Sequence, residues 1–151
     1  MGLLDLASGN SLWRGYDYFK EKKVQNVRQI EDGCYEGVVS GSGQKFYHVT
    51  FNLPHPRTSK CNCPHADGKR IICKHMVALY FTVFPEEAKR IYEEAIAAQE
   101  EEEKRQEELE NKLVTFVSKM KKDELQQALL EMLFDGPEWQ YERFLREHWI
   151  E

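Results

Sequence analysis

Apolar side chains recur with two different periods along this chain. Near the start they fall three or four positions apart, which predicts a helix that Asn10 or Ser11 could cap. The residues on its apolar face are Leu12, Trp13, Tyr16 and Phe19. Apolar and polar residues alternate over 47–53, which predicts a half-buried strand. A short strand is expected at 34–40 between two turn signals, whereas 24–30 fits either a helix or a strand.

The second half of the chain is predicted to be helical. Residues 72–84 are apolar almost throughout and should form the most buried helix, and Pro85 then begins a long helix with a thin apolar stripe. Asp123 could cap a further helix, and a turn at 135–137 precedes a last one. The apolar residues of that last helix are Trp139, Tyr141, Phe144, Leu145 and Trp149. We expect the apolar stripes of this region to be buried by packing.

These elements predict an α+β fold in two parts. Residues 1–85 should contain the first helix, a small antiparallel sheet of two or three strands and a finger whose core is about 47–84. Residues 86–151 should form a helical extension. A sheet this small buries little apolar surface, so we expect a metal to supply stability that packing cannot.

Three of the four cysteines lie within one window of fifteen residues. One residue separates Cys61 from Cys63, nine residues follow, and one residue separates Cys73 from His75. Three thiolates and one imidazole are a complete tetrahedral ligand set for Zn²⁺, whereas magnesium and calcium prefer oxygen ligands. The spacing therefore predicts one structural zinc ion per chain at these four residues. The alternative is that the cysteine pairs and the histidine are unrelated.

The stretch from Tyr47 to Phe84 resembles the SWIM zinc finger family. That family has the pattern Cys-x-Cys, a variable stretch and Cys-x-His, with strands before the first pair and a helix carrying the second. The motif covers roughly a quarter of the chain, and the flanks at 13–22 and 112–150 are similar to those of small bacterial proteins built around one such finger. The resemblance implies that the same four residues are the zinc ligands. It also implies binding of DNA or protein, without one particular reaction.

The fourth ligand has one competitor, and the closed site argues against catalysis. His65 follows the first cysteine pair closely, but the family pattern and the helical Cys73-x-His75 pair favour His75. Zinc with four protein ligands has no position left at which to activate water. The chain also lacks a phosphate-binding loop and a His-Glu-x-x-His motif. We therefore expect no catalytic residues, no enzymatic activity and no small-molecule substrate. One alternative stays open, because a cysteine and a histidine that are distant in sequence could still meet in the fold and form a nucleophilic pair.

Charge is unevenly distributed along the chain, whose net charge is −5. Between residues 54 and 75 five basic residues stand against one acid, whereas 86–110 contains eleven acids and four bases. The five basic residues are Arg57, Lys60, Lys69, Arg70 and Lys74. Because salt screens charges beyond about 8–10 Å, this local excess governs close contacts. These cations are candidate phosphate contacts, or they simply keep an exposed zinc loop soluble.

The partner that these features favour is nucleic acid, with DNA first, bound through the basic finger. The alternatives are a protein–protein adaptor that uses the finger and the C-terminal helices, or a stabilising finger whose function lies elsewhere in the chain. No apolar run approaches a membrane span, and the start lacks a basic leader with a long apolar stretch. Cysteines in metal spacing favour a reducing compartment, so we expect a cytoplasmic protein. The oligomeric state does not follow from the sequence.

Overall fold

The computed structural model describes residues 2–148 and contains two compact units, Met1–Ile96 and Ala97–Glu151. Trp149 and Ile150, which the sequence places in the last helix, lie outside the described residues. The division into a finger domain and a helical extension at residues 85 and 86 stays a prediction.

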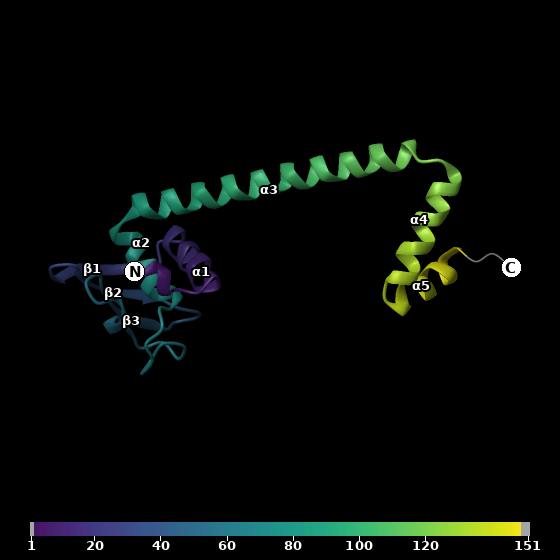
Figure 1. Cartoon of the computed structure of the whole chain (residues 1–151). Coiled ribbons are helices and arrows are strands. Elements are labelled where there is room, and N and C mark those ends of the chain that lie inside the picture. Colours follow the sequence, from purple (N-terminus) through teal and green to yellow (C-terminus); the bar gives the residue numbers. More distant parts are fainter. Residues whose placement is uncertain (1, 149–151) are drawn as a thin grey trace. The chain divides into compact units, whose positions relative to one another are not determined.

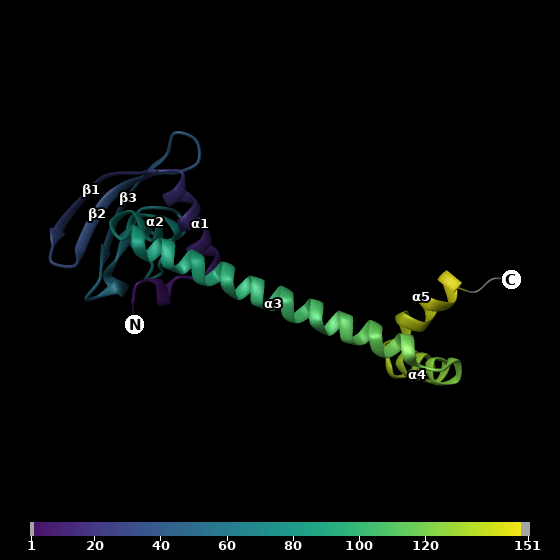
Figure 2. The ribbon, with the colours of Figure 1, turned by 90° about the horizontal axis from the view of Figure 1, so that it is seen from above.

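The first unit is built on an antiparallel sheet whose strands follow one another in chain order (Figure 2). Its strands are β1 (Val24–Glu31), β2 (Cys34–Ser40), β3 (Phe46–Asn52) and β4 (Lys60–Cys61). The described residues therefore contain four strands, where the sequence predicted two or three. The ambiguous segment forms β1 because it pairs with β2 along its length. The two residues of β4 are too few to leave an alternating pattern, and only their pairing with β3 reveals them.

Two helices, α1 (Gly9–Lys20) and α2 (Lys74–Val83), pack against each other, and α2 also packs on the sheet (Figure 1). The cap of α1 is Ser8, whose hydroxyl accepts a hydrogen bond from the Ser11 backbone, so the predicted caps were wrong by two or three positions. Helix α2 begins two residues later than predicted because Cys73 is extended and serves as its N-cap. Short 3₁₀ turns complete the unit at Leu4–Leu6 and Pro56–Thr58.

The core of the first unit lies between α2 and the sheet. Its fully buried side chains include Val39, Val49, Phe51, Met76, Leu79 and Phe81. Helix α1 packs against this core with Leu12, Tyr16 and Phe19, and its Gly15 lies against α2. A Cβ atom placed there would lie 2.5 Å from Cβ of Val77 and 2.9 Å from the carbonyl oxygen of Lys74. The lack of a side chain at Gly15 is therefore what lets the backbones of α1 and α2 approach so closely.

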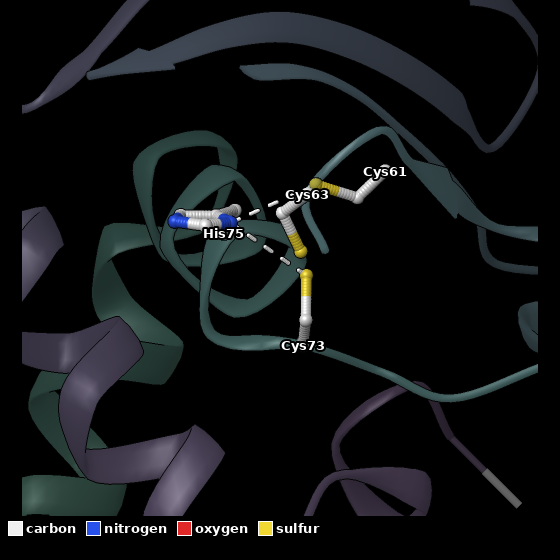
Figure 3. A group of neighbouring side chains, drawn as sticks. All are labelled: Cys61, Cys63, Cys73 and His75. Atoms are coloured by element: carbon white, nitrogen blue, oxygen red, sulfur yellow. Dashed lines mark hydrogen bonds between the residues drawn. The ribbon is translucent and has the colours of Figure 1, made fainter. Parts of the chain in front are cut away.

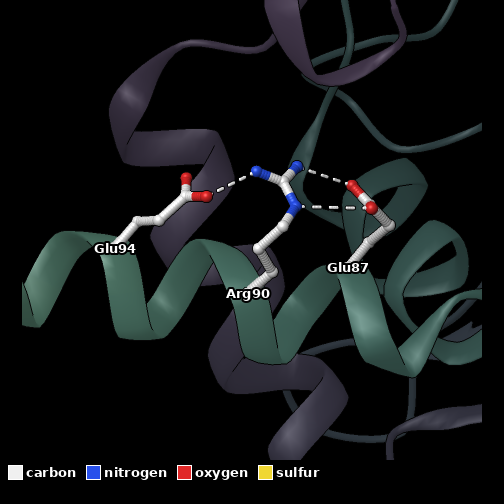
Figure 4. Close-up of polar contacts among 3 residues, drawn as sticks. All are labelled: Glu87, Arg90 and Glu94. Atoms are coloured by element: carbon white, nitrogen blue, oxygen red, sulfur yellow. Dashed lines mark hydrogen bonds and ion pairs between the residues drawn. The ribbon is translucent and has the colours of Figure 1, made fainter.

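Helix α3 (Pro85–Lys119) begins at the proline, as the sequence predicted. Its first turns belong to the first unit, where Ala88 is buried and the ring of Tyr92 stacks on Tyr16 with 5.0 Å between centroids. Here Arg90 donates hydrogen bonds to Glu87 and Glu94, one turn away on either side (Figure 4). Ion pairs between residues three or four apart stabilise a helix, and they do so here in a segment with few apolar contacts.

The second unit contains the rest of α3, then α4 (Lys122–Asp135) and α5 (Glu138–His148). Asp123 lies inside the first turn of α4 and is not its cap, because Glu124 accepts the hydrogen bond from the Lys121 backbone. The expected burial of the apolar stripes is not found in the described part of the unit, where Leu133 is the one buried apolar residue. Large side chains that stay exposed include Leu109, Leu113, Phe116, Met132, Phe134 and Trp139.

The predicted α+β class is confirmed, with a small antiparallel sheet, a finger helix and a helical C-terminal region. The described residues include five α-helices. None of the helices in 2–148 combines the length and apolar content that crossing a membrane requires.

The close crossing of α1 and α2 predicts that Gly15→Ala destabilises the first unit. The new methyl group must displace Val77 or the helix backbone, and overpacking of this kind costs about 1–3 kcal/mol in the free energy of unfolding. Gly9→Ala is the matched control, because a Cβ atom there meets no other atom within 4 Å. Urea denaturation of both variants checks this, and an unchanged midpoint for Gly15→Ala would contradict it.

Candidate metal centre

The chain delivers four potential metal ligands from two directions. Cys61 ends β4 and Cys63 follows in the next loop, while Cys73 caps α2 and His75 lies in the first turn of that helix. All four side chains are buried, with at most 3% of each residue exposed. Figure 3 shows the three sulfur atoms and one imidazole nitrogen turned toward a common point. The cluster thus joins the end of the sheet to the start of the helix.

The distances within the cluster match those of a metal site. The four ligand atoms all lie within 4.8 Å of one another. Nδ1 of His75 is 3.7 Å from Sγ of Cys61 and 3.9 Å from Sγ of Cys73. Tetrahedral zinc with its usual bond lengths separates ligand atoms by roughly 3.6–3.8 Å. Three cysteines that form no disulfide, together with a buried imidazole, are a donor set that fits one Zn²⁺ ion.

Burial and hydrogen bonding set the protonation of the cysteine pair. A hydrogen bond with Cys61 lowers the pKa of Cys73 to about 4, although burial acts in the opposite direction. The side chain and backbone N–H of His75 and the backbone N–H of Met76 help to lower it. The hydrogen bond to Cys73, burial and the negative charge of Cys73 together raise the pKa of Cys61. Because zinc binds thiolates, loading the site must displace the Cys61 proton.

Two aromatic residues hold the imidazole of His75 in place. The ring of Tyr47 stacks on it with 4.4 Å between centroids, and Tyr18 approaches it edge-on at 5.5 Å. The Lys74 ammonium donates a hydrogen bond of 2.8 Å to the Tyr18 hydroxyl and lies over the same ring. Nε2 of His75 points away from the sulfur atoms, and it is a buried nitrogen with no hydrogen-bond partner among the described residues.

The remaining cysteine and the competing histidine lie apart from this cluster. Cys34 is buried at the start of β2 and does not join the group. His65 is exposed in the loop after Cys63, and the cluster found in residues 2–148 does not include it. The geometry therefore favours His75 as the imidazole ligand.

Four of the five predicted phosphate contacts line one groove. Its volume is about 890 Å³, and it also contains His48, Thr50, Asn62 and one acid, Asp67. The four cations are Arg57, Lys60, Lys69 and Arg70, all of them exposed. None of these four forms an ion pair within residues 2–148. Lys74 does not join them, because it turns toward Tyr18 on α1.

Sequence reasoning missed the neighbours of the cluster that come from other elements. Tyr18 and Tyr47 lie in a helix and a strand that the sequence predicted, yet nothing in the sequence showed that both contact His75. Arg14 lies one turn before Tyr18 on α1, and both residues line one pocket with His75. The spacing of Arg14 and Tyr18 is the one feature of the sequence that could have linked them, since residues four apart share a helix face.

The geometry predicts that Cys73→Ser loses zinc. Serine cannot replace the thiolate, and apparent zinc-binding free energies of small fingers are about 10–16 kcal/mol, so the loss should loosen residues 47–84. The helices of the second unit contain none of the four residues and should persist. Elemental analysis and hydrogen exchange measure the two effects.

Cys34→Ser is the matched control because it removes a buried thiol outside the cluster. It should keep one zinc ion per chain. Equal zinc contents in Cys73→Ser and Cys34→Ser would overturn the ligand assignment.

Comparison with known proteins agrees with the geometry of the cluster. The family model of the SWIM zinc finger matches residues 47–84. A search of curated proteins and a search of solved structures each found no similar chain. The matched segment runs from Tyr47, which stacks on the imidazole, to the end of α2, and it contains all four residues of the cluster. Residues 47–84 are therefore a SWIM-type zinc finger, a binding module whose Cys₃His cluster is positioned for one zinc ion.

Proposed function

We propose that this finger is a non-catalytic module that binds nucleic acid, with DNA as the first candidate. Binding would use the basic groove lined by Arg57, Lys60, Lys69 and Arg70. The observation that carries the proposal is that these cations share one groove and form no ion pairs within the described residues. Cations that already pair with carboxylates would have to break those contacts before they met phosphate. Cations without such pairs are available to a polyanion.

Strand pairing and one side-chain hydrogen bond hold the backbone beneath the groove. Lys60 lies on β4 beside Cys61, and its Cα pairs with that of Thr50 across the sheet. The side chain of Asn62 accepts a hydrogen bond of 2.9 Å from the His48 backbone, which fixes the next residue of the loop. Zinc bound at the cluster would also hold this loop in place, because Cys61 and Cys63 flank Asn62. Long cationic side chains lose rotamer freedom when they dock, so a fixed backbone reduces the remaining entropic cost.

The groove supports contact with the phosphate backbone more than reading of bases. Its cations are point charges or forks suited to phosphate, and phosphate contacts carry no sequence information. The acidic run of α3 would repel the same backbone wherever the two came close. We therefore propose binding of low sequence specificity in a cytoplasmic protein. The closed ligand set of the cluster supports the non-catalytic part of the proposal.

Salt dependence tests this function. If all four cations each neutralise one phosphate of a duplex, the logarithm of the binding constant should fall against the logarithm of salt concentration with a slope of about −3.6. The double variant Lys69→Ala/Arg70→Ala should make this slope shallower by about two units and keep its zinc. Fluorescence titration of zinc-loaded protein with duplex DNA, single-stranded DNA and structured RNA measures it.

The matched control is Lys112→Ala/Lys119→Ala, which removes the same charge from the exposed surface of α3 outside the groove. Its slope should equal that of the unchanged protein. No binding to any of the three nucleic acids at low salt would reject the proposed function.

A second candidate function, a protein–protein adaptor, is favoured by one separate observation. Apolar side chains on α3, α4 and α5 of the second unit are exposed, with Phe116 at 66% and Phe134 at 75%. Such side chains, when they form a continuous patch, mark interaction surfaces. This candidate requires no nucleic acid and uses a different part of the chain from the groove.

The adaptor function predicts that Leu113→Gln/Phe116→Gln abolishes association. Both residues lie on the exposed stripe of α3, and polar replacements remove the apolar area that would be buried. Cross-linking with mass spectrometry should show partners or self-association in the unchanged protein that the apolar variant loses. Identical cross-links in the two proteins would exclude this surface.

A further inference from the structure

A second pocket lies between α1 and the finger, and its volume is about 340 Å³. It is called the α1 pocket here, and its defining residues are Arg14, Tyr18, Tyr47, Lys74 and His75. It shares no residue with the basic groove. Side chains alternate between the two faces of a strand, so Tyr47 of β3 lines the pocket while the adjacent His48 lines the groove. The two hollows therefore lie on opposite faces of β3.

The α1 pocket has the charge of an anion site. Arg14 and Lys74 both line it, and no carboxylate is found among the described residues of its wall. Arg14 forms no ion pair within residues 2–148. A zinc ion bound by three thiolates and an imidazole carries a single net negative charge. The two cations of the wall outweigh that charge, so the pocket attracts anions even beside a loaded metal centre.

Hydrogen-bond donors converge on the same space. Ser8, Asn10 and Ser11 place the first turn of α1 in the wall. The Ser11 N–H already donates to the Ser8 hydroxyl, whereas the other N–H groups of the first turn have no partner within the helix. The hydroxyl of Tyr18 accepts its hydrogen bond from Lys74 and keeps its own proton to donate. A ligand with several acceptor oxygens would satisfy these groups together.

The imidazole of His75 supplies an independent sign that an acceptor is missing. Its Nδ1 faces the sulfur atoms, so with a metal there the ring proton lies on Nε2. Metal-bound histidines usually donate this second N–H to an oxygen atom, yet Nε2 is buried and has no partner within residues 2–148. The ring lies between Tyr47 and Tyr18, which both line the α1 pocket, and His75 itself forms part of the wall.

We propose that the α1 pocket binds a phosphate monoester, the group carried by a nucleotide or by the phosphorylated end of a nucleic-acid strand. A phosphate dianion matches two cations, and its oxygens accept the paired N–H groups of Arg14 as well as the Lys74 ammonium. The pocket also has Cys63 and Cys73 of the metal centre in its wall, so the space left beside a zinc ion suits one phosphate-bearing group and not a long polymer. This site does not depend on the basic groove.

Calorimetric titration of the zinc-loaded full chain at low salt tests the pocket. The probes are inorganic phosphate, adenosine 5′-monophosphate, adenosine, and one short oligonucleotide with either a 5′-phosphate or a 5′-hydroxyl end. We expect a phosphate-bearing probe to bind and its unphosphorylated counterpart to bind at least about tenfold more weakly. Equal binding of free phosphate, mononucleotide and phosphorylated strand supports a site for soluble phosphate compounds, whereas a gain seen only with the phosphorylated strand supports capture of a strand end.

Arg14→Gln should weaken binding of the phosphate-bearing probe about tenfold and keep one zinc ion per chain. Lys20→Gln is the matched control, because it removes the same charge from α1 outside the pocket. Lys69→Ala/Arg70→Ala should leave the preference for a phosphate end intact, which separates failure of this site from failure of the groove. Equal binding of phosphorylated and unphosphorylated probes, or an unchanged affinity in Arg14→Gln, would overturn the proposal.

Discussion

The meeting of three cysteine sulfurs with one imidazole is the interaction on which the finger depends. It joins β4, a strand of only two residues, to the first turn of α2. Two backbone pairs hold β4 on β3, and the loop that follows has few apolar side chains to bury. A buried cluster of thiols and an imidazole is costly unless its polar groups find partners, and zinc provides one partner for all four. The metal would thus fix a loop that packing alone leaves weakly held.

The surface of the finger has two hollows with different chemistry, the basic groove and the α1 pocket. The groove has exposed cations on an open surface, which suits a repeating polyanion. The α1 pocket is smaller, has one cation from α1 and one from α2, and ends against the metal centre itself. Both depend on the cluster, because Lys60 adjoins Cys61 and Lys74 lies between Cys73 and His75. Loss of zinc would therefore disturb both.

The sequence predicted the Cys₃His cluster because its signal is local. The spacing of two short Cys-x-Cys and Cys-x-His pairs, with an apolar helix after the second, restricts the geometry strongly, and the α+β class followed from the change of hydrophobic period. Strand β4 was missed because two residues cannot display a period. The cap of α1 was misplaced because serine and asparagine occur at several adjacent positions, and only the backbone shows that Ser8 is extended.

The pocket could not be predicted because tertiary packing creates it. Arg14 and Lys74 are sixty positions apart, and they line one pocket because Gly15 lets α1 and α2 cross closely. The exposed stripes of the second unit failed the expectation of burial for a related reason. Periodicity shows that a helix has an apolar face, but it does not show what covers that face.

The central claim is that one zinc ion is held in a closed shell by three sulfur atoms and one nitrogen atom. X-ray absorption at the zinc edge of the purified full chain tests it most directly. The account predicts three sulfur neighbours at about 2.3 Å and one nitrogen at about 2.0–2.1 Å, with no oxygen neighbour. A shell that contains water oxygen, or one with two sulfur and two nitrogen neighbours, would contradict it, because the site would then be open or His65 would have replaced a cysteine.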